Sequence, residues 1–309
     1  MEKVLNVIEV ILPIFAAVFL GVFARKRQLI TQEENRGLQQ FVMKFGLPCV
    51  LFNSCLDATI GAESLTSMAL LLPLLLVSVF CGFYLRRKKF RYHNLPQLFA
   101  AKETGMLGIS LLAVLFGSEH AYRMGVLDMT QTLTSIPVIS ILAADTGDNP
   151  KPAAIVGKVF RSPLLLMSLA GLLLNLTGAA DWLYSIGVGS ILTAVTGFIA
   201  QPVSAAMMFS VGYNFSIDRN NRGPIFKISG IHFVLFVLVT LIVQAGLFLV
   251  PAVEPETRWA VLLYCMLPAS YLAPGLGHNE EDYTVASGVC SLLTVACLIV
   301  FCIMAVIIA

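Results

Sequence analysis

Apolar runs long enough to cross a lipid bilayer follow one another along the whole chain. A transmembrane helix needs about 20 mostly apolar residues, and ten runs meet this length, with short connections between them. The runs are residues 5–24, 38–56, 65–85, 95–116, 121–143, 160–178, 184–212, 229–250, 257–276 and 284–308. The sequence therefore predicts an all-α polytopic membrane protein with ten transmembrane helices.

Composition supports this interpretation. Hydrophobic residues make up 58% of the chain and charged residues 12%, and the mean hydropathy is +0.85. Soluble domains carry about 25% charged residues. A soluble fold cannot bury so much apolar surface, whereas a membrane protein presents it to lipid. With a net charge of +2, the sequence argues against a soluble enzyme and against a nucleic-acid-binding protein, and makes the lipid bilayer the expected partner.

The seven cysteines lie in apolar stretches, with no CxxC pair and no histidine cluster nearby. Cysteines scattered in this way behave as small hydrophobic residues, so we expect no disulfide, no metal site and no cofactor. At the N-terminus only Lys3 precedes the first apolar run, and no small-residue cleavage site follows that run before the basic cluster. We therefore expect a retained first helix instead of a signal peptide.

Basic residues alternate between the two sides of the predicted helices. The first, third, fifth and seventh connections hold 15 of the 20 lysines and arginines, whereas the opposite side holds only Lys3, Arg123 and Arg258. Cytoplasmic loops are the ones enriched in Lys and Arg. The sequence thus predicts a protein of the plasma (inner) membrane with both termini on the non-cytoplasmic side.

The two halves of the chain resemble each other. Residues 108–117 align with residues 268–277, and the shared register matches Ser110 with Ser270, Leu112 with Leu272, Ala113 with Ala273, Gly117 with Gly277 and Thr134 with Thr294. Five helices per half force opposite orientations, which is a transporter architecture. We predict two inverted five-helix repeats, 1–144 and 160–309, joined by a cytoplasmic connection at 145–159.

Glycine and proline predict interruptions in the fourth and ninth helices. The fourth contains Gly105 and Gly108, and the ninth contains Pro268 and Pro274. The second and seventh helices carry related breaks, Gly46-Leu47-Pro48 and Ala200-Gln201-Pro202. Broken helices expose unpaired backbone groups, and their N-terminal ends favour anions. Two broken helices that cross at mid-depth would therefore form a small cavity suited to a carboxylate.

Several stretches resemble the auxin efflux carrier family. Asn35 to Phe52 is similar to its second span, and Leu12 to Gly21 followed by Arg25-Lys26-Arg27 is similar to its first. Glu103-Thr104-Gly105-Met106-Leu107-Gly108-Ile109-Ser110 resembles its Asn-Thr-Gly-x-x-Gly-x-Pro pattern, and Met266 to Ala269 resembles the matching element. Two departures stand out, since Glu103 replaces the family's Asn and Ser110 replaces its Pro.

This resemblance carries its own expectations. The family includes plant auxin carriers and bacterial permeases for malate and similar acids, within the bile-acid/arsenite/riboflavin transporter superfamily. It implies ten helices in a bile-acid/sodium symporter-like and NhaA-like fold, with the fourth and ninth helices crossed. It also implies a scaffold of helices 1, 2, 6 and 7, a moving domain of helices 3–5 and 8–10, and a homodimer.

Ionisable residues inside predicted helices mark the candidate site. Such a group costs roughly 2.5–3.5 kcal/mol at the bilayer centre and is usually functional or paired. Asp128 lies mid-helix, facing the fourth helix if the repeat holds, and Glu103 lies beside the predicted break; each is a coupling candidate, with a structural hydrogen bond as the alternative for Asp128. The full set of predicted substrate-site residues is Lys44, Asn53, Lys102, Glu103, Thr104, Gly105, Gly108, Asp128, Pro268, Ala269 and Ser270.

Three basic residues allow different interpretations. Lys102 is expected to pair with Asp128, to bind a substrate carboxylate, or to snorkel to the cytoplasmic surface. Lys44, four residues before Pro48, has the same choice between function and snorkelling. His232 reads as a satisfied interfacial histidine. The polar residues Asn53, Thr104, Gln131, Gln201 and Ser270 line a cavity or hydrogen-bond between helices.

The leading function is secondary active transport of a small organic anion, such as malate or an auxin-like carboxylate, by alternating access at the crossing of helices 4 and 9. Coupling to H⁺ and coupling to Na⁺ both remain open, with Glu103 and Asp128 as the coupling groups. A transporter-like membrane sensor or ligand receptor is the alternative. An enzyme is not expected, because no nucleophile–base pair or metal cluster occurs at mid-depth.

Overall fold

A computed structural model describes residues 2–56, 62–145, 161, 163–215, 218, 220–250 and 253–308. Within these ranges all regular structure is helical, and the β pairing consists of one isolated antiparallel bridge. The predicted connection at 145–159 lies almost entirely outside the described residues. The all-helical class predicted from the sequence is confirmed.

The helices follow the predicted apolar runs, and several of them are divided. They are α1 (Glu2–Lys26), α2 (Gln32–Phe41), η1 (Val42–Gly46), α3 (Leu47–Leu56), α4 (Ala62–Lys88), α5 (Leu95–Ala100), η2 (Thr104–Gly108), α6 (Ile109–Phe116), η3 (Ser118–His120), α7 (Ala121–Asp145), α9 (Pro163–Leu176), α10 (Ala179–Ser185), α11 (Val188–Ala200), α12 (Val203–Asn214), α13 (Arg222–Phe248), α14 (Pro255–Met266), η4 (Pro274–Leu276) and α15 (Glu280–Ile308). Here η1 and η2 are π-helical, whereas η3 and η4 are 3₁₀ turns.

Within the described residues, length and apolar character identify fewer spans than the sequence predicts. Ala62–Lys88, Val188–Asn214, Arg222–Phe248 and Glu280–Ile308 are each long and apolar enough to cross a membrane. The pair Leu165–Leu176 and Ala179–Ser185, bent by 82°, would be a fifth span. The interruptions explain part of the difference from ten, because α5, α6 and α14 have only 6, 8 and 12 residues. The ten-span arrangement stays a prediction.

Boundaries differ from the sequence prediction in two places. Helix α13 begins at Arg222, whereas the predicted span begins at residue 229, because polar and basic residues extend the helix beyond its apolar part. The predicted connection after residue 178 is instead the short helix α10. Apolar content marks what lies in lipid, and a helix continues past that boundary wherever its backbone hydrogen bonds continue.

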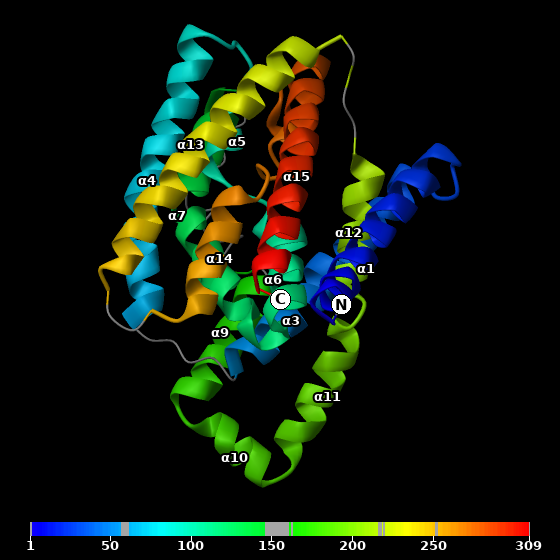
Figure 1. Ribbon diagram of the computed structural model, residues 1–309, viewed down its shortest axis with the longest axis vertical. Coiled ribbons are helices and arrows are strands. Elements are labelled where there is room, and N and C mark those ends of the chain that lie inside the picture. Colours follow the sequence, from blue (N-terminus) through cyan, green and yellow to red (C-terminus); the bar gives the residue numbers. More distant parts are fainter. Residues whose placement is uncertain are drawn as a thin grey trace.

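Close helix pairs build the fold (Figure 1). Helix α1 packs along α12, and α9 packs along α3. Gly21 of α1 lies against the backbone oxygen of Phe209, and Gly212 of α12 lies against that of Val18, so a methyl group at either glycine would overlap backbone. Small residues permit such close approach between membrane helices. Helix α4 packs against α5 and α7, and α13 packs against α14 and α15.

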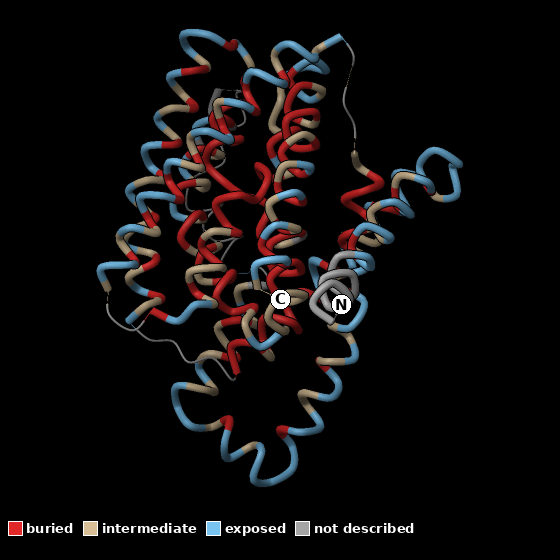
Figure 2. Tube along the Cα trace, viewed as in Figure 1, coloured by how far each residue is buried: buried red, intermediate tan, exposed pale blue. Residues whose placement is uncertain are grey.

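Large side chains are buried between the helices, and other large apolar side chains are exposed. Phe99, Phe236 and Tyr264 are fully buried, whereas Phe80 and Phe198 are more than 70% exposed. Outer faces of α4, α11 and α13 are exposed along their length in Figure 2. Apolar surface of this extent is unfavourable in water and suits lipid.

Local sequence explains the start and the bend of the second helical run. Thr31 and Glu34 form a capping box at the start of α2, in which each side chain binds the other's backbone N–H. The pKa of Glu34 lies below its usual range because the backbone N–H and the hydroxyl of Thr31 donate to the carboxylate. Further along, Leu47 N–H donates to the carbonyl of Val42, five residues earlier, directly before Pro48. A proline without an N–H favours such a π-helical bulge.

Candidate functional site at the helix crossing

Two interrupted helices cross at an antiparallel bridge. Helix α5 ends at Ala100, residues 101–103 are extended, and η2 and α6 follow; helix α14 ends at Met266, and an irregular stretch leads to η4. At the crossing, Glu103 N–H donates to Pro268 O at 3.0 Å, and Ser270 N–H donates to Ala101 O at 3.0 Å. Lys102 and Ala269 are the bridge residues. Each segment thus supplies hydrogen-bond partners for backbone groups that the other leaves unpaired.

Proline and glycine allow the crossing, as the sequence predicts. Pro268 has no N–H to continue α14, so the helix ends two residues earlier, at Met266, with Leu267 as its cap. Gly108 lies against Leu267, and a methyl group on Gly108 would stand 2.7 Å from Leu267 Cδ1. A larger residue at 108 would therefore require the side chain of Leu267 to move. The predicted interruptions in both helices are confirmed, and so is the break between α11 and α12 at Gln201-Pro202.

Gln131 of α7 holds the extended segment 101–103 in place. Its Oε1 accepts hydrogen bonds from Lys102 N–H at 2.7 Å and from the Tyr264 hydroxyl at 3.0 Å. Its Nε2 donates to Lys102 O at 3.1 Å, to Thr104 Oγ1 at 3.1 Å and to Asp128 Oδ1 at 2.7 Å. The amide satisfies both backbone groups of Lys102, as a neighbouring strand would. Gln131 was expected to line a cavity or bond between helices, and the second is what the structure shows.

The two predicted coupling carboxylates bind donors within the crossing. Asp128 accepts from the Thr104 hydroxyl and from Gln131. Glu103 is 7% exposed, and its Oε2 accepts from Tyr271 N–H at 2.6 Å. The Tyr271 hydroxyl in turn lies 2.6 Å from Thr294 Oγ1 of α15. Asp128 therefore fixes the first broken helix, and Glu103 ties the first broken helix to the second.

Lys102 points away from both carboxylates. Its ammonium lies 3.3 Å from His232 Nε2, donates to Leu267 O at 3.1 Å, and stands 3.2 Å from the centre of the Phe236 ring. The predicted pairing of Lys102 with Asp128 is wrong, because the Asp128 carboxylate is directed to Thr104 and Gln131. Snorkelling is wrong as well, since Lys102 is 2% exposed. His232 is 1% exposed and lies within hydrogen-bond distance of Lys102, as expected for a satisfied histidine, and its depth in the membrane stays a prediction.

The predicted site residues fall into three places. Around the crossing lie Lys102, Glu103, Thr104, Gly105, Gly108, Asp128, Pro268, Ala269 and Ser270. Asn53 of α3 lies apart from these and accepts a hydrogen bond from Thr196 of α11 at 2.6 Å. The side chain of Lys44 is exposed on η1.

A cavity of about 540 Å³ lies beside the crossing, between α3, α6, α11 and α12. Its polar lining comes from Asn53, Ser110, Ser118, Gln201 and Ser204. The Ser110 hydroxyl is buried and has no hydrogen-bond partner within the described part of the chain. Pockets of roughly 300–1,000 Å³ are the usual size for small-molecule sites, and an unpaired buried hydroxyl is available to a ligand.

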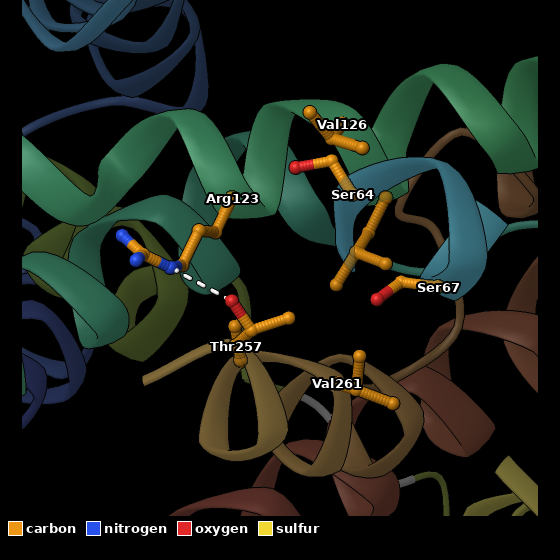
Figure 3. A pocket seen from close by; sticks show the side chains of 8 residues that line it. Ser64, Ser67, Arg123, Val126, Thr257 and Val261 are labelled. Atoms are coloured by element: carbon orange, nitrogen blue, oxygen red, sulfur yellow. Dashed lines mark hydrogen bonds between the residues drawn. The ribbon is translucent and has the colours of Figure 1, made fainter. Parts of the chain in front are cut away.

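A buried ion-pair cluster outside the predicted site lies at the start of α7. Arg123 is 5% exposed, forms an ion pair with Glu254 and lies 3.9 Å from Glu63 Oε1. Its Nε donates to Thr257 Oγ1 at 3.0 Å (Figure 3), and its Nη1 lies 2.6 Å from His120 Nδ1. Glu63 also accepts from Glu254 N–H and from the Thr257 hydroxyl, both at 2.9 Å.

This cluster joins the ends of three helices, α4, α7 and α14. The small cavity beside it, lined by Ser64, Ser67, Arg123 and Thr257, measures about 10 Å³, which is room for about one water molecule. The sequence contains an indication of this cluster. Arg123 is one of only three basic residues on the predicted non-cytoplasmic side, and Glu63 and Glu254 flank predicted helices on that same side.

The remaining chemistry-bearing residues form no metal site in the described ranges, where no group of three or more His, Cys, Asp or Glu is placed to hold a metal ion. All seven cysteines are free.

A known protein family matches part of the chain. Residues 6–146 match the family model of a membrane transport protein. No curated protein matches the chain. The matched residues include the first, second and fourth predicted spans, which carry most of the resemblance to auxin efflux carriers, and that resemblance is confirmed. Residues 6–146, somewhat less than half of the chain, are thus similar to membrane transport proteins of the auxin efflux carrier-like family.

Proposed function

We propose that this protein is a secondary active transporter of a small organic anion, working by alternating access around the helix crossing. The observation that carries the proposal is the bridge between Lys102 and Ala269, which joins two interrupted helices 167 residues apart in sequence. Interrupted helices that meet inside a helical membrane protein are the arrangement in which transporters hold substrate and ions. The family match of residues 6–146 supports the same class of function.

Packing supports the proposed inverted repeat of two five-helix halves. Helix α1 pairs with α12, and α9 pairs with α3, which are equivalent contacts if the second half repeats the first. In the same way α4 packs against α5 and α7, whereas α13 packs against α14 and α15. The interruptions at 101–103 and 267–273 also occupy corresponding helices. We take these paired contacts as support for ten spans.

The proposed orientation has support of the same kind. The end of α4, with Arg86 to Lys88, and the beginning of α13, with Arg222, both lie at the top of Figure 1. Basic residues gathered at one end are typical of a cytoplasmic face. The Arg123 cluster lies near the opposite ends of α4 and α13, which we assign to the outside.

The substrate class follows from the cavity. Its wall combines hydroxyl and amide groups with apolar side chains, among them Ser110, Asn53 and Phe198. Helix η2 begins at Thr104, where the first free backbone N–H groups of a half-helix favour a negative charge. A small carboxylate with an apolar or hydroxylated body, such as malate or an auxin-like acid, suits both features.

The proposed change between outward-facing and inward-facing states would take place across the cavity. One wall is α6, which belongs to the crossing, and the other walls are α3, α11 and α12. We propose that the crossing, with α4, α7, α13, α14 and α15, moves against the scaffold that contains the close pairs α1–α12 and α3–α9. Such a movement would expose the cavity to each side of the membrane in turn.

Glu103 and Asp128 take a holding role in this proposal. The sequence assigns them ion coupling, and that assignment stays a prediction. Their carboxylates accept hydrogen bonds from Tyr271 N–H and from Thr104 and Gln131, so we propose that they keep the crossing together.

Flux through sealed proteoliposomes tests the function. Liposomes loaded with unlabelled malate are expected to take up labelled malate by exchange, and a panel of mono- and dicarboxylates ranks the substrates by competition. The variant Gly197→Leu fills the cavity from a glycine whose Cβ would have open space, and is expected to abolish exchange. Gly230→Leu, also in open space but exposed on α13, is the matched control.

Either of two results would contradict the proposal. One is binding of the acids without any exchange, which favours a receptor. The other is equal exchange by wild type and Gly197→Leu protein, which would remove the cavity from the route.

A further inference from the structure

Lys102 is a buried lysine whose amine has three neutral partners. Its ammonium faces a ring nitrogen of His232, the carbonyl oxygen of Leu267 and the face of the Phe236 ring. An ammonium has three N–H donors and no acceptor, and these partners match the three donors. Two of the partners, His232 and Phe236, come from α13, and Leu267 ends α14 at the crossing.

His232 is held so that it accepts from Lys102. Its ring is hydrogen-bonded to the backbone of Leu98, and Nε2 is the atom that faces Lys102. A neutral imidazole has one donor nitrogen and one acceptor nitrogen. The nitrogen on the Leu98 side is the donor, so Nε2 is the acceptor. The chain of hydrogen bonds runs from Lys102 through His232 to the backbone of α5.

Within the described residues no carboxylate pairs with Lys102. The titratable groups that face it are His232 from α13, the thiol of Cys265 from α14 and the thiol of Cys297 from α15. Glu103 is directed to Tyr271 and Asp128 to Thr104. A buried charge without an opposite charge carries a desolvation cost of several kcal/mol. The proton on Lys102 is therefore held by neutral acceptors and not by an opposite charge. Such a proton is lost more readily than a proton in a salt bridge.

The pair lies on the far side of the crossing from the cavity. Lys102 contacts α13 and α14, whereas the cavity is lined by α3, α6, α11 and α12. Its contacts all belong to the group of helices assigned above to the moving part. A proton bound there would travel with the moving part while the anion occupies the cavity in front of it.

We propose that Lys102 and His232 form the coupling-proton site of the transporter, an inference that rests on the proposed function. One proton binds at the Lys102 amine, is held between Nζ and His232 Nε2, and leaves to water on the other side of the membrane, with both side chains then neutral. Charged Lys102 and the anion attract each other through the protein, so each promotes binding of the other. The protonated amine already donates to Leu267 O. This carbonyl at the crossing therefore needs no sodium ion as its partner.

The test uses the full-length protein in proteoliposomes with labelled malate as the probe. Wild type is expected to accumulate malate under an inward proton gradient, with or without sodium. Lys102→Met is expected to lose accumulation and to retain malate exchange at high malate concentration, because exchange needs no net proton movement. Lys227→Gln removes an exposed lysine of α13 and is the matched control, with accumulation unchanged.

A second variant keeps the test decisive if Lys102→Met does not fold. His232→Gln retains an acceptor for the ammonium and is expected to shift the pH at which accumulation is half-maximal, while exchange persists. Accumulation by Lys102→Met equal to wild type, an unshifted pH profile in His232→Gln, or accumulation driven by sodium alone would each overturn the proton site and leave the proposed transport intact. If wild type shows neither exchange nor accumulation with any acid of the panel, the proposed function itself fails.

Discussion

Arg123 and Lys102 are both buried cations, and their surroundings differ completely. Arg123 lies between two carboxylates, Glu63 and Glu254, with a hydroxyl and an imidazole on its remaining donors. Lys102 has a carbonyl, an imidazole and an aromatic face. A buried ion pair stabilises the fold as long as both partners keep their charge. A buried lysine without an opposite charge can lose its proton. The first arrangement suits a fixed clamp and the second a site that binds and releases a proton.

The difference has a chemical side as well. An arginine keeps its proton in proteins and binds through a rigid fork, whereas a buried lysine exchanges its proton readily. The clamp joins α4, α7 and α14 at one end of the molecule, and the lysine lies at the crossing of the broken helices. Substitutions at the Arg123 cluster should therefore change the stability of the protein, whereas substitutions at Lys102 should change proton coupling.

The largest effect on stability is expected from Arg123→Gln. Removal of the cation leaves Glu63, whose side chain is 11% exposed, beside Glu254, which is 50% exposed. Breaking a buried pair costs about 3–5 kcal/mol; since water screens Glu254, we expect about 2–3 kcal/mol here. Thermal unfolding of the purified protein in detergent measures the loss. An unchanged midpoint would show that the cluster is no clamp.

The clamp also predicts non-additivity. Glu254→Gln alone removes one of two carboxylates, and in the double variant with Arg123→Gln the uncompensated negative charge is smaller. The double variant should therefore be less destabilised than the sum of the single variants, by about 1 kcal/mol. The same unfolding assay on all four proteins gives the coupling energy, and simple additivity would contradict the pairing.

Next in size is Gln131→Leu, which removes the amide that satisfies both backbone groups of Lys102. Leucine has a similar size and no polar atoms, so the backbone groups and the Tyr264 hydroxyl lose their partner. Each unsatisfied buried group costs about 1–3 kcal/mol, and relaxation of the segment reduces the sum to roughly 2 kcal/mol. Gln131→Glu keeps the acceptor oxygen but replaces the donating amide with an oxygen that faces Lys102 O and Asp128 Oδ1, so it should lose at least as much in the unfolding assay. A smaller loss for Gln131→Glu than for Gln131→Leu would contradict the role assigned to the donating amide.

The sequence predicts the positions of the breaks better than the partners of the charges. Pro268 and Gly108 act locally, because a missing N–H or a missing Cβ changes the chain where it stands. The break at Gln201-Pro202 follows in the same way. Lys102 and His232 lie 130 residues apart, so their contact depends on how α13 packs on the crossing. Arg123 and Glu254 are 131 residues apart, so their contact is equally hard to predict from the sequence. The charge pattern predicts only that they lie on the same side of the membrane.

A smaller effect is expected from Glu103→Gln. The amide oxygen of glutamine can accept from Tyr271 N–H in place of the carboxylate, and the substitution should cost about 1 kcal/mol or less. If Lys102 carries the coupling proton, malate accumulation under a proton gradient should survive in this variant. Loss of accumulation with exchange intact would return the coupling role to Glu103, where the sequence placed it.

The smallest change in stability is expected from Lys102→Met, the counterpart of Arg123→Gln. Methionine has a similar length and packs against Phe236, but it leaves Leu267 O and His232 Nε2 without their donor, at a cost of about 1–3 kcal/mol. Removal of an unpaired buried charge offsets this, since apolar replacements of buried charges are often neutral or stabilising by about 1–4 kcal/mol. The unfolding midpoint of Lys102→Met should thus lie close to wild type or above it. A loss as large as that of Arg123→Gln would mean that the ammonium is a structural element like the guanidinium, and the contrast between the two cations would disappear.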